Sequence, residues 1–298
     1  MATLVIGVAF IVWFGVRLGM GPLLDLEDAI ARRSAQDLTP ISRPIPQEVQ
    51  GIVGRLNALL SDMSATIRAK DSFISNAAHQ LRNPISGVVA LSEAVAASKT
   101  TEDFKVRSAD LTEAASHAAK LTEDLLAFER ARSAPPPQEL PIEEVVTIVR
   151  NAVARQQRLA EANGVTVRLT TESDEAYARA DTLLLEQAIE NLIANALTHG
   201  GADLNQVHVG ISAGQQRLTI TVADNGRGLE PSQFEMALSR FGQVTPGSGS
   251  GLGLPIAQAV AEALGGALEL TPNASGLCVK IVIPTEDMIQ RDLAAASA

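Results

Sequence analysis

Apolar residues recur at alternating steps of four and three along residues 49–95. This spacing places them on one stripe of a long helix and is typical of a coiled coil. Twelve of the fourteen positions carry nonpolar residues other than proline. The positions are Val49, Val53, Leu56, Leu60, Met63, Ile67, Lys70, Ile74, Ala77, Leu81, Pro84, Val88, Leu91 and Val95.

A second stripe with the same spacing predicts another helix over residues 104–128. Its positions are Phe104, Arg107, Leu111, Ala114, Ala118, Leu121, Leu125 and Phe128. Two helices alone cannot bury both stripes, so the pattern favours a homodimer in which two helix hairpins form a four-helix bundle. The run Ser133-Ala134-Pro135-Pro136-Pro137-Gln138 cannot continue a helix and predicts an extended linker.

After this linker the pattern alternates between helical and strand periods. Strands are expected over residues 165–169, 207–211, 218–222, 267–271 and 277–283, and helices over 142–162, 182–198 and 251–264. Turn-length connections and this order predict an α/β sandwich, with one mixed sheet and helices on one face. The fold class of the whole chain is therefore α+β.

The first residues have a different character, because residues 2–16 carry no charge. Fifteen helical residues span about 22 Å, which is shorter than the ~30 Å hydrocarbon core of a bilayer, unless Arg17 extends to the interface. A signal peptide is the alternative, but the chain lacks a basic start, and Gly19-Met20-Gly21-Pro22 is a poor cleavage site. The sequence favours a membrane helix over residues 1–24, with the basic residues that follow it in the cytoplasm.

Composition narrows the classes of function. The net charge of −10 and the pI of about 5.0 argue against direct binding of nucleic acid. The single cysteine, Cys278, excludes an intrachain disulfide and is expected in the core of a strand. None of the four histidines stands at zinc-ligand spacing from cysteines or acids.

His79 lies two residues from Ala77 and from Leu81, so it points away from the apolar stripe into solvent. Pro84 has no N–H for the carbonyl of Gln80 and is expected to kink the helix beside His79. Exposed helical histidines are most often ordinary surface residues, so this geometry alone assigns no role.

The segment Phe73-Ile74-Ser75-Asn76-Ala77-Ala78-His79-Gln80-Leu81-Arg82-Asn83-Pro84-Ile85 resembles the phospho-acceptor box of bacterial sensor histidine kinases. The resemblance implies that His79 is phosphorylated and that Asn83 positions water for removing phosphate from the partner protein. Gln80 stands where the family usually has an acid that takes the imidazole proton. An amide can accept a hydrogen bond but not that proton, so we expect slow autophosphorylation. The segment Ala-Ala-His-Gln-Leu-Arg is similar to the corresponding segment of tricarboxylate-sensing kinases.

Three later motifs each suit one part of a nucleotide. Asn191 and Asn195 stand one helical turn apart, and their amide oxygens suit Mg²⁺. Asp224 precedes an Asn-Gly turn and can accept a hydrogen bond from an adenine amino group. A glycine-rich run, residues 247–253, opens a helix whose N–H groups can bind phosphate. Taken singly, each motif also fits an ordinary structural role: a solvent-exposed helix face, a turn after a strand or a flexible linker.

Together these motifs resemble the N, G1 and G2 boxes of the ATPase fold shared by histidine kinases, DNA gyrase, mismatch-repair ATPases and certain chaperones. The resemblance implies ATP and Mg²⁺ as cofactors, with Asn195 and Asn191 as metal ligands. The residues that it places at the nucleotide are Asn191, Asn195, His199, Asp224, Gly226, Gly228, Gly249, Gly251, Leu252 and Gly253. It covers residues 71–285, and a weaker likeness to HAMP linkers covers 20–70.

The chain lacks two cationic residues that this family often has. Thr198 replaces the lysine of the N box, and Gln243 stands where family lids often carry arginine. Arg240, in the expected lid over residues 229–248, is predicted to compensate, since a guanidinium suits phosphate.

The sequence thus predicts a membrane helix (1–24), a HAMP-like linker and coiled coil (25–70), a dimerisation and phosphotransfer domain (71–133), a catalytic ATP-binding domain (139–286) and a tail (287–298). The resemblance implies a kinase at the bacterial inner membrane, with its catalytic part in the cytoplasm, that phosphorylates His79 and passes the phosphate to the receiver domain of a response regulator. A nucleotide-gated dimeric scaffold and a phosphatase-biased pseudokinase are the alternatives. The stimulus, the regulator, the choice between phosphorylation within and between subunits, and the presence of a preceding sensor domain stay open.

Overall fold

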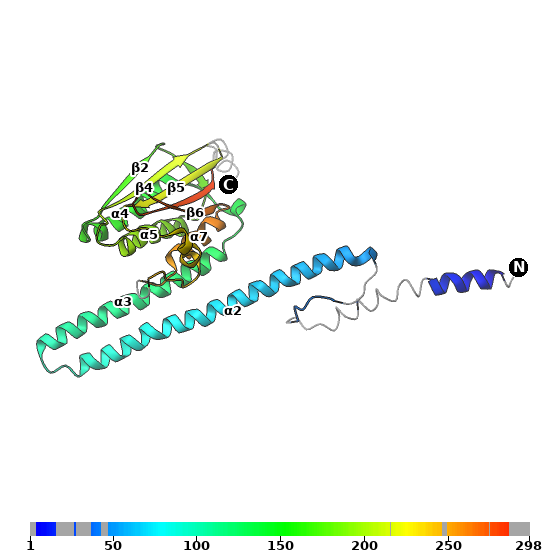
Figure 1. Ribbon diagram of the computed structural model, residues 1–298, viewed down its shortest axis with the longest axis horizontal. Coiled ribbons are helices and arrows are strands. Elements are labelled where there is room, and N and C mark those ends of the chain that lie inside the picture. The colour runs from blue at the N-terminus through cyan, green and yellow to red at the C-terminus, as the bar shows by residue number, and fades with distance from the viewer. Residues whose placement is uncertain are drawn as a thin grey trace. The chain divides into compact units, whose positions relative to one another are not determined.

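The computed structural model describes residues 4–15, 27, 37–42, 47–214, 216–245, 249–273 and 275–285 (Figure 1). The chain divides into two compact units, Met1–Asn76 and Ala77–Ala298.

In the first unit, residues 4–15 are helical and their side chains are exposed. No helix in the described part of the chain combines the length and the apolarity of a membrane span. The remaining residues of the membrane helix predicted over 1–24 lie outside the described residues. Helix α2 (Gln47–Ala96) begins in this unit and continues into the second.

Asn57 of α2 holds the backbone of Ile41 at both of its polar groups. The N–H of Ile41 donates to Asn57 Oδ1 at 2.7 Å, and Asn57 Nδ2 donates to the carbonyl of Ile41 at 3.1 Å. Since buried backbone groups need partners, this amide lets the apolar side chain of Ile41 be buried without cost to its backbone.

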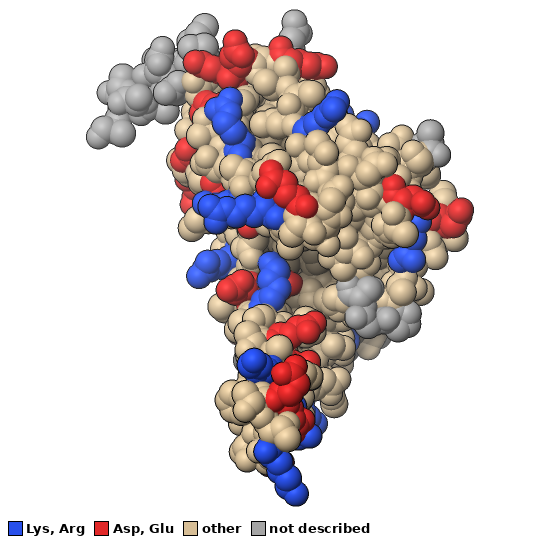
Figure 2. Space-filling model, turned by 90° about the vertical axis from the view of Figure 1, so that its left-hand side faces the viewer, with Lys and Arg blue, Asp and Glu red and all other residues tan. Residues whose placement is uncertain are grey.

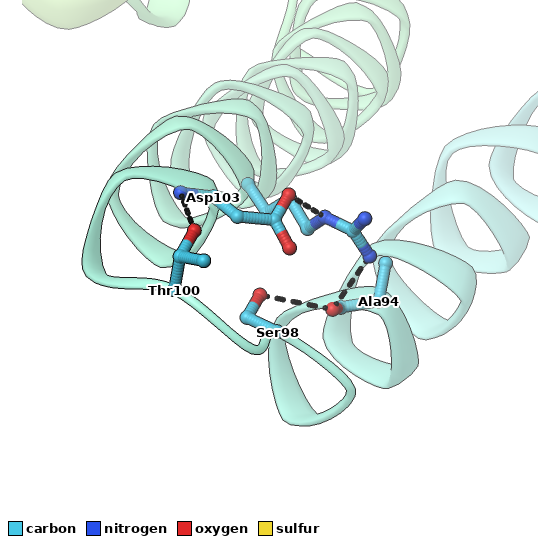
Figure 3. A network of polar contacts seen from close by, with 5 residues as sticks. Ala94, Ser98, Thr100 and Asp103 are labelled. Atoms are coloured by element: carbon cyan, nitrogen blue, oxygen red, sulfur yellow. Dashed lines mark hydrogen bonds and ion pairs between the residues drawn. The ribbon is translucent and has the colours of Figure 1, made fainter.

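In the second unit, α2 runs as one helix through Pro84, and α3 (Thr101–Arg132) follows after a short turn. Polar contacts fix this turn (Figure 3). Thr100 caps α3 by accepting from the N–H of Asp103 at 3.2 Å. Arg107 donates to Asp103 at 2.7 Å and to the carbonyl of Ala94 at 2.9 Å, which ties α3 to the end of α2.

The linker after α3 leads through a 3₁₀ turn, η1 (Pro137–Glu139), to strand β1 (Ile142–Glu144) and helix α4 (Val145–Ala162). The sequence predicted helix from residue 142, which is wrong for the first three residues. Residues 142–144 pair antiparallel with β3 (Tyr177–Arg179). The carboxylate of Glu144 accepts from the N–H groups of Val146 and Thr147, so Glu144 caps α4 from an extended conformation.

The main sheet has five strands in the order β2-β4-β5-β7-β6, and only the β2–β4 pair is parallel. Its strands are β2 (Thr166–Thr171), β4 (Gln206–Ala213), β5 (Arg217–Asp224), β6 (Ala267–Pro272) and β7 (Leu277–Pro284). Each of these contains most of a strand predicted from the sequence. Cys278 lies in β7 as expected but is partly exposed, because the buried Val279 takes the inner face.

Helices cover one face of this sheet (Figure 1). They are α4, α5 (Thr182–His199) and α7 (Gly253–Ala263), and a shorter segment contains η2 (Pro231–Gln233) and α6 (Phe234–Leu238). Burial alternates along β4 and β5, as expected for a sheet with one covered face. The core is formed by fully buried side chains that include Leu185, Ile189, Ile193, Leu218, Ile220, Ile256 and Ile281.

The C-terminal half of α3 packs against α7 and α5. Its buried residues include Leu121, Leu125 and Phe128, three positions of the stripe predicted to face a helical bundle. In this arrangement the catalytic part covers them, so one face of α3 contributes to the surroundings of the site.

Candidate functional site

A cavity of about 260 Å³ opens between α5, α7, the end of β5 and α3. Eight of the ten residues that the sequence placed at a nucleotide line it: Asn191, Asn195, His199, Asp224, Gly228, Gly249, Gly251 and Gly253. Thr198 and Gln243 line it as well. Motifs that lie up to 62 residues apart in the chain therefore surround one space.

The amides of α5 form one wall. Asp181 caps this helix by accepting from the N–H of Leu184 at 3.1 Å. Asn191 is 4% exposed, and its Nδ2 has no hydrogen-bond partner among the described residues. A buried polar atom without a partner is costly, so Asn191 is suited to a ligand that would supply one.

Asp224 ends β5 and is almost completely buried. Burial raises the pKa of its carboxyl group, and hydrogen bonds from the backbone of Gly226 and Leu277 partly oppose that rise. Gly226 does not line the cavity. A Cβ there would overlap the backbone of Gly200, and the N–H of Arg227 donates to the Gly200 carbonyl at 2.9 Å, so Gly226 lets this turn approach the end of α5.

The glycine-rich loop meets the lid segment at Gly251. Gly251 has φ +66°, and a Cβ on it would lie 2.9 Å from the Cα of Phe241. The N–H of Phe241 donates to the Gly251 carbonyl at 3.1 Å, and Phe241 itself has φ 60°. Leu252 does not line the cavity, since its side chain is fully buried and anchors the loop before α7. The N-terminus of α7 then faces the cavity at Gly253, where the helix dipole favours anions.

His199 and Arg227 lie together at the end of α5. Burial and the charge of Arg227 lower the pKa of His199. The imidazole is therefore neutral at pH 7 and offers one donor and one acceptor. Arg227 lines the cavity and donates to Thr245 at 2.9 Å. The sequence motif contained this arginine, but our interpretation of the motif gave it no role.

Four residues of α3 also line the cavity: His117, Lys120, Leu121 and Asp124. Asp124 is 4% exposed and accepts from the hydroxyl of Ser250, in the glycine-rich loop, at 2.9 Å. Sequence reasoning missed these residues. Their i,i+4 spacing shows only that Lys120 and Asp124 share a face of a helix, and nothing in it indicates what that face contacts.

The remaining predicted residues lie elsewhere. His79, Gln80 and Asn83 are exposed on α2 and do not line the cavity. Arg240 also lies outside the cavity lining, and its guanidinium is 5.0 Å from the ring centroid of Phe128 on α3. Burial, followed by the charge of Arg132, lowers the pKa of Arg240. The side chain expected to compensate for the missing cations thus stacks on an aromatic ring in this arrangement.

Charges on the face shown in Figure 2 are mixed, with Lys and Arg interspersed among Asp and Glu. No extended patch of one sign stands out on that face of the described residues. Mixed surfaces of this kind do not favour long-range attraction of one class of charged partner.

Three family models match the chain in sequence. They are the sensor protein PhoQ-like HAMP domain at residues 20–65, the His kinase A phospho-acceptor domain at 69–134, and the histidine kinase-, DNA gyrase B- and HSP90-like ATPase at 180–287. The second match contains His79, and the third contains all ten residues predicted at the nucleotide.

Two sensor proteins are similar to this chain in sequence. The sensor protein kinase PmrB of Pseudomonas aeruginosa is 26% identical over 92% of this chain and 58% of its own length. The sensor protein IrlS of Burkholderia pseudomallei is 28% identical over 84% of this chain and 54% of its own length. The chain thus spans a little over half the length of these relatives. The resemblance to tricarboxylate-sensing kinases is not supported by these comparisons.

Solved structures share the fold. The Acinetobacter baumannii histidine kinase AdeS has a TM-score of 0.54 and 20% identity, covering 70% of this chain and 98% of its own. Full-length ShkA in complex with AMPPNP has a TM-score of 0.53 and 24% identity, covering 72% of this chain and 46% of its own. With the phospho-acceptor hairpin, the ATPase sandwich and the three matching models in this order, the chain belongs to the two-component sensor histidine kinases.

Proposed function

We propose that this chain transfers the γ-phosphoryl group of ATP to His79 and then to an aspartate on the receiver domain of a response regulator. One observation carries the proposal: the N-box amides, Asp224 and the glycine-rich loop, which are separate in the chain, line a single cavity. The match of residues 69–134 to the phospho-acceptor domain supports His79 as the acceptor.

The lining residues fit Mg²⁺–ATP. Asp224 would accept a hydrogen bond from the adenine amino group, and the N-terminus of α7 would hold phosphate. Asn191 and Asn195 would supply oxygen ligands to Mg²⁺, which in such sites bridges and neutralises phosphate oxygens. The Nδ2 of Asn191, which has no hydrogen-bond partner among the described residues, is a donor and would bind a phosphate oxygen, so it supports a nucleotide in this cavity and not the Mg²⁺ ligation by the amide oxygen.

His79 would act through Nε2. A bond forms between Nε2 and the γ-phosphorus as the bond from that phosphorus to the oxygen of ADP breaks. Gln80 can accept a hydrogen bond from Nδ1–H and so leave Nε2 free, but it cannot take the imidazole proton, which passes to water at this exposed position. Because His79 lies outside the cavity lining, the reaction requires either a movement of the catalytic part relative to the phospho-acceptor helix or a second copy of the chain that brings its own histidine to this cavity.

The test is incubation of the chain with γ-labelled ATP and Mg²⁺. We expect an acid-labile label on the wild type that is lost in His79→Gln. The control is His208→Gln on β4, whose imidazole contacts Thr170 and lies outside the cavity lining, and which should retain the label. Label of equal strength in His79→Gln would contradict the assignment.

A phosphatase-biased pseudokinase or a nucleotide-gated scaffold is the second candidate. Gln80 at the expected base and Thr198 and Gln243 at the expected cations favour it. The two proposals are separated by giving the chain a phosphorylated receiver domain. Loss of phosphate from that domain, together with Mg²⁺–ATP binding and no label on His79, would favour the second candidate.

We also propose that the chain acts as a homodimer at the bacterial inner membrane, with its catalytic part in the cytoplasm. Met63, Ile67 and Ile74, three stripe positions of α2, are at least 41% exposed, which is unfavourable unless a partner covers them. The uncharged, exposed side chains of residues 4–15 support attachment to a membrane. Light scattering in detergent would give the mass, and a mass of one chain would contradict the dimer.

A further inference from the structure

The cavity contains few positive charges. Among the described residues that line it, the one lysine is Lys120 of α3 and the one arginine is Arg227. Thr198 and Gln243, at the two positions where the family resemblance leads one to expect cations, are neutral and line the same cavity. A triphosphate with one Mg²⁺ still carries negative charge and is bound most strongly by charge-assisted hydrogen bonds.

Lys120 lies at the end of the cavity expected to hold phosphate. Its Nζ is 3.4 Å from Oδ1 of Asn191, one of the proposed Mg²⁺ ligands. It is also 2.9 Å from Oδ1 of Asp124, as an ion pair without the angles of a hydrogen bond. The other oxygen of Asp124 accepts from Ser250 in the glycine-rich loop. The ammonium of Lys120 is thereby positioned between the N-box amide and that loop.

We propose that Lys120 contacts the phosphates of the bound nucleotide, and that α3 supplies the positive charge that Thr198 does not. The inference rests on the proposed function, since it places ATP in this cavity. Asp124 is then a positioning residue that holds the ammonium toward Asn191 and Ser250. Tight phosphate binding requires α3 to be docked on the catalytic part, so nucleotide affinity reports on that docking.

A purely structural role makes a different prediction. In that case Lys120 only neutralises Asp124, whose side chain is 5% exposed, while half of the lysine side chain remains in solvent. Removing the charge would then leave a buried carboxylate without its ion-pair partner and would weaken the docking of α3. Every ligand of the cavity would be affected alike, because no contact to phosphate would be lost.

The experiment compares Mg²⁺–ATP and adenosine as ligands of the full chain by calorimetry. Lys120→Met keeps most of the side-chain stem and removes the charge. We expect it to bind ATP about tenfold more weakly and adenosine with unchanged affinity, while Lys120→Arg retains most of the ATP affinity. Lys105→Met, at the other lysine of α3, exposed and outside the cavity lining, is the matched control and should bind both ligands like the wild type.

Three results would overturn the inference: ATP affinity of Lys120→Met equal to the wild type, higher than the wild type, or lowered by the same factor as adenosine affinity. Thermal unfolding shows whether each variant is folded, and Lys120→Arg keeps the comparison valid if the Met variant is not. Wild-type label at His79 is measured separately. Its absence, with the expected Lys120 effect, would contradict the kinase alone, whereas a wild type that binds no ATP would contradict both proposals.

Discussion

Gly253, at the start of α7, lies directly against the side chain of Asn195 on α5. A Cβ added to Gly253 would lie 2.7 Å from both the Oδ1 and the Nδ2 atoms of Asn195. Real Cβ atoms do not approach so closely, so one of the two helices or the amide itself would have to move. The glycine therefore sets the distance between the proposed Mg²⁺ ligand and the helix N-terminus proposed to hold phosphate.

This contact predicts the effect of Gly253→Ala. The substitution displaces Asn195, and we expect Mg²⁺–ATP affinity to fall by at least about tenfold, with a loss of folding stability of ~1–3 kcal/mol, as is usual for overpacking. Calorimetric titration and urea unfolding measure the two effects. Gly51→Ala, on α2 with no atom within 4 Å of the added Cβ, is the control and should leave affinity unchanged. Wild-type affinity in Gly253→Ala would show that Asn195 need not keep this position.

The predicted residues that line the cavity lie in motifs whose chemistry is local. Asn191 and Asn195 could be predicted to share a helix face, and the glycines could be predicted to open a helix, because backbone geometry fixes both. Gly226 and Leu252 belong to the same motifs but support the cavity walls without lining the cavity. Sequence patterns do not distinguish a residue that lines a cavity from one that lies behind the lining and supports it.

Contacts between distant segments could not be predicted in this way. Lys120 and Asn191 are 71 residues apart, and only the docking of α3 brings them together. Arg240 was predicted at phosphate because a guanidinium suits that ligand, and the structure places it on Phe128. Glu144 was assigned to a helix because its role as a cap depends on the pairing of β1 with β3.

The position of Arg240 predicts how its loss divides between binding and catalysis. Its guanidinium lies over the ring of Phe128 and not along the cavity. We expect Arg240→Ala to lower the rate of His79 phosphorylation at least tenfold and to change Mg²⁺–ATP affinity less than twofold, as for a residue that acts in the transition state. Rates at saturating labelled ATP and separate binding titrations measure the two quantities.

Arg132 provides the control for this prediction, since its guanidinium lies 6.0 Å from the centroid of the same ring. Arg132→Ala removes a cation near Phe128 without touching the lid segment and should leave the rate of phosphorylation close to that of the wild type. Equal losses of rate and affinity in Arg240→Ala would contradict a transition-state role. Equal effects of both substitutions would assign the effect to the packing of Phe128.

Gln80 predicts a slow phosphoryl transfer that a carboxylate would accelerate. The amide can orient the imidazole of His79 but cannot take its proton, so Gln80→Glu should raise the initial rate of labelling, by roughly 10²-fold or more if general-base catalysis is fully restored. Gln80→Ala should slow the reaction, because it removes the hydrogen bond as well. Both residues are exposed on α2, so neither change should alter the thermal stability by more than ~0.5 kcal/mol. An unchanged or lower rate in Gln80→Glu would remove the idea that this position limits the kinase.

His199 predicts a loss of stability on acidification. Burial and the nearby charge of Arg227 lower its pKa in the folded protein below the ordinary value of 6.5. As the pH falls through 6.5, the unfolded chain binds a proton at this residue before the folded chain does, and the free energy of unfolding therefore decreases until the pH passes below the folded pKa. The effect is absent above about pH 7.5, where His199 is neutral in both states.

Urea unfolding of the nucleotide-free protein across this range should show a steeper decrease for the wild type than for His199→Gln, which has no proton to bind at this site. An NMR titration of the imidazole should give a midpoint below 6.5. A midpoint at or above that value, or identical pH dependence in the two proteins, would show that neither burial nor Arg227 controls this histidine.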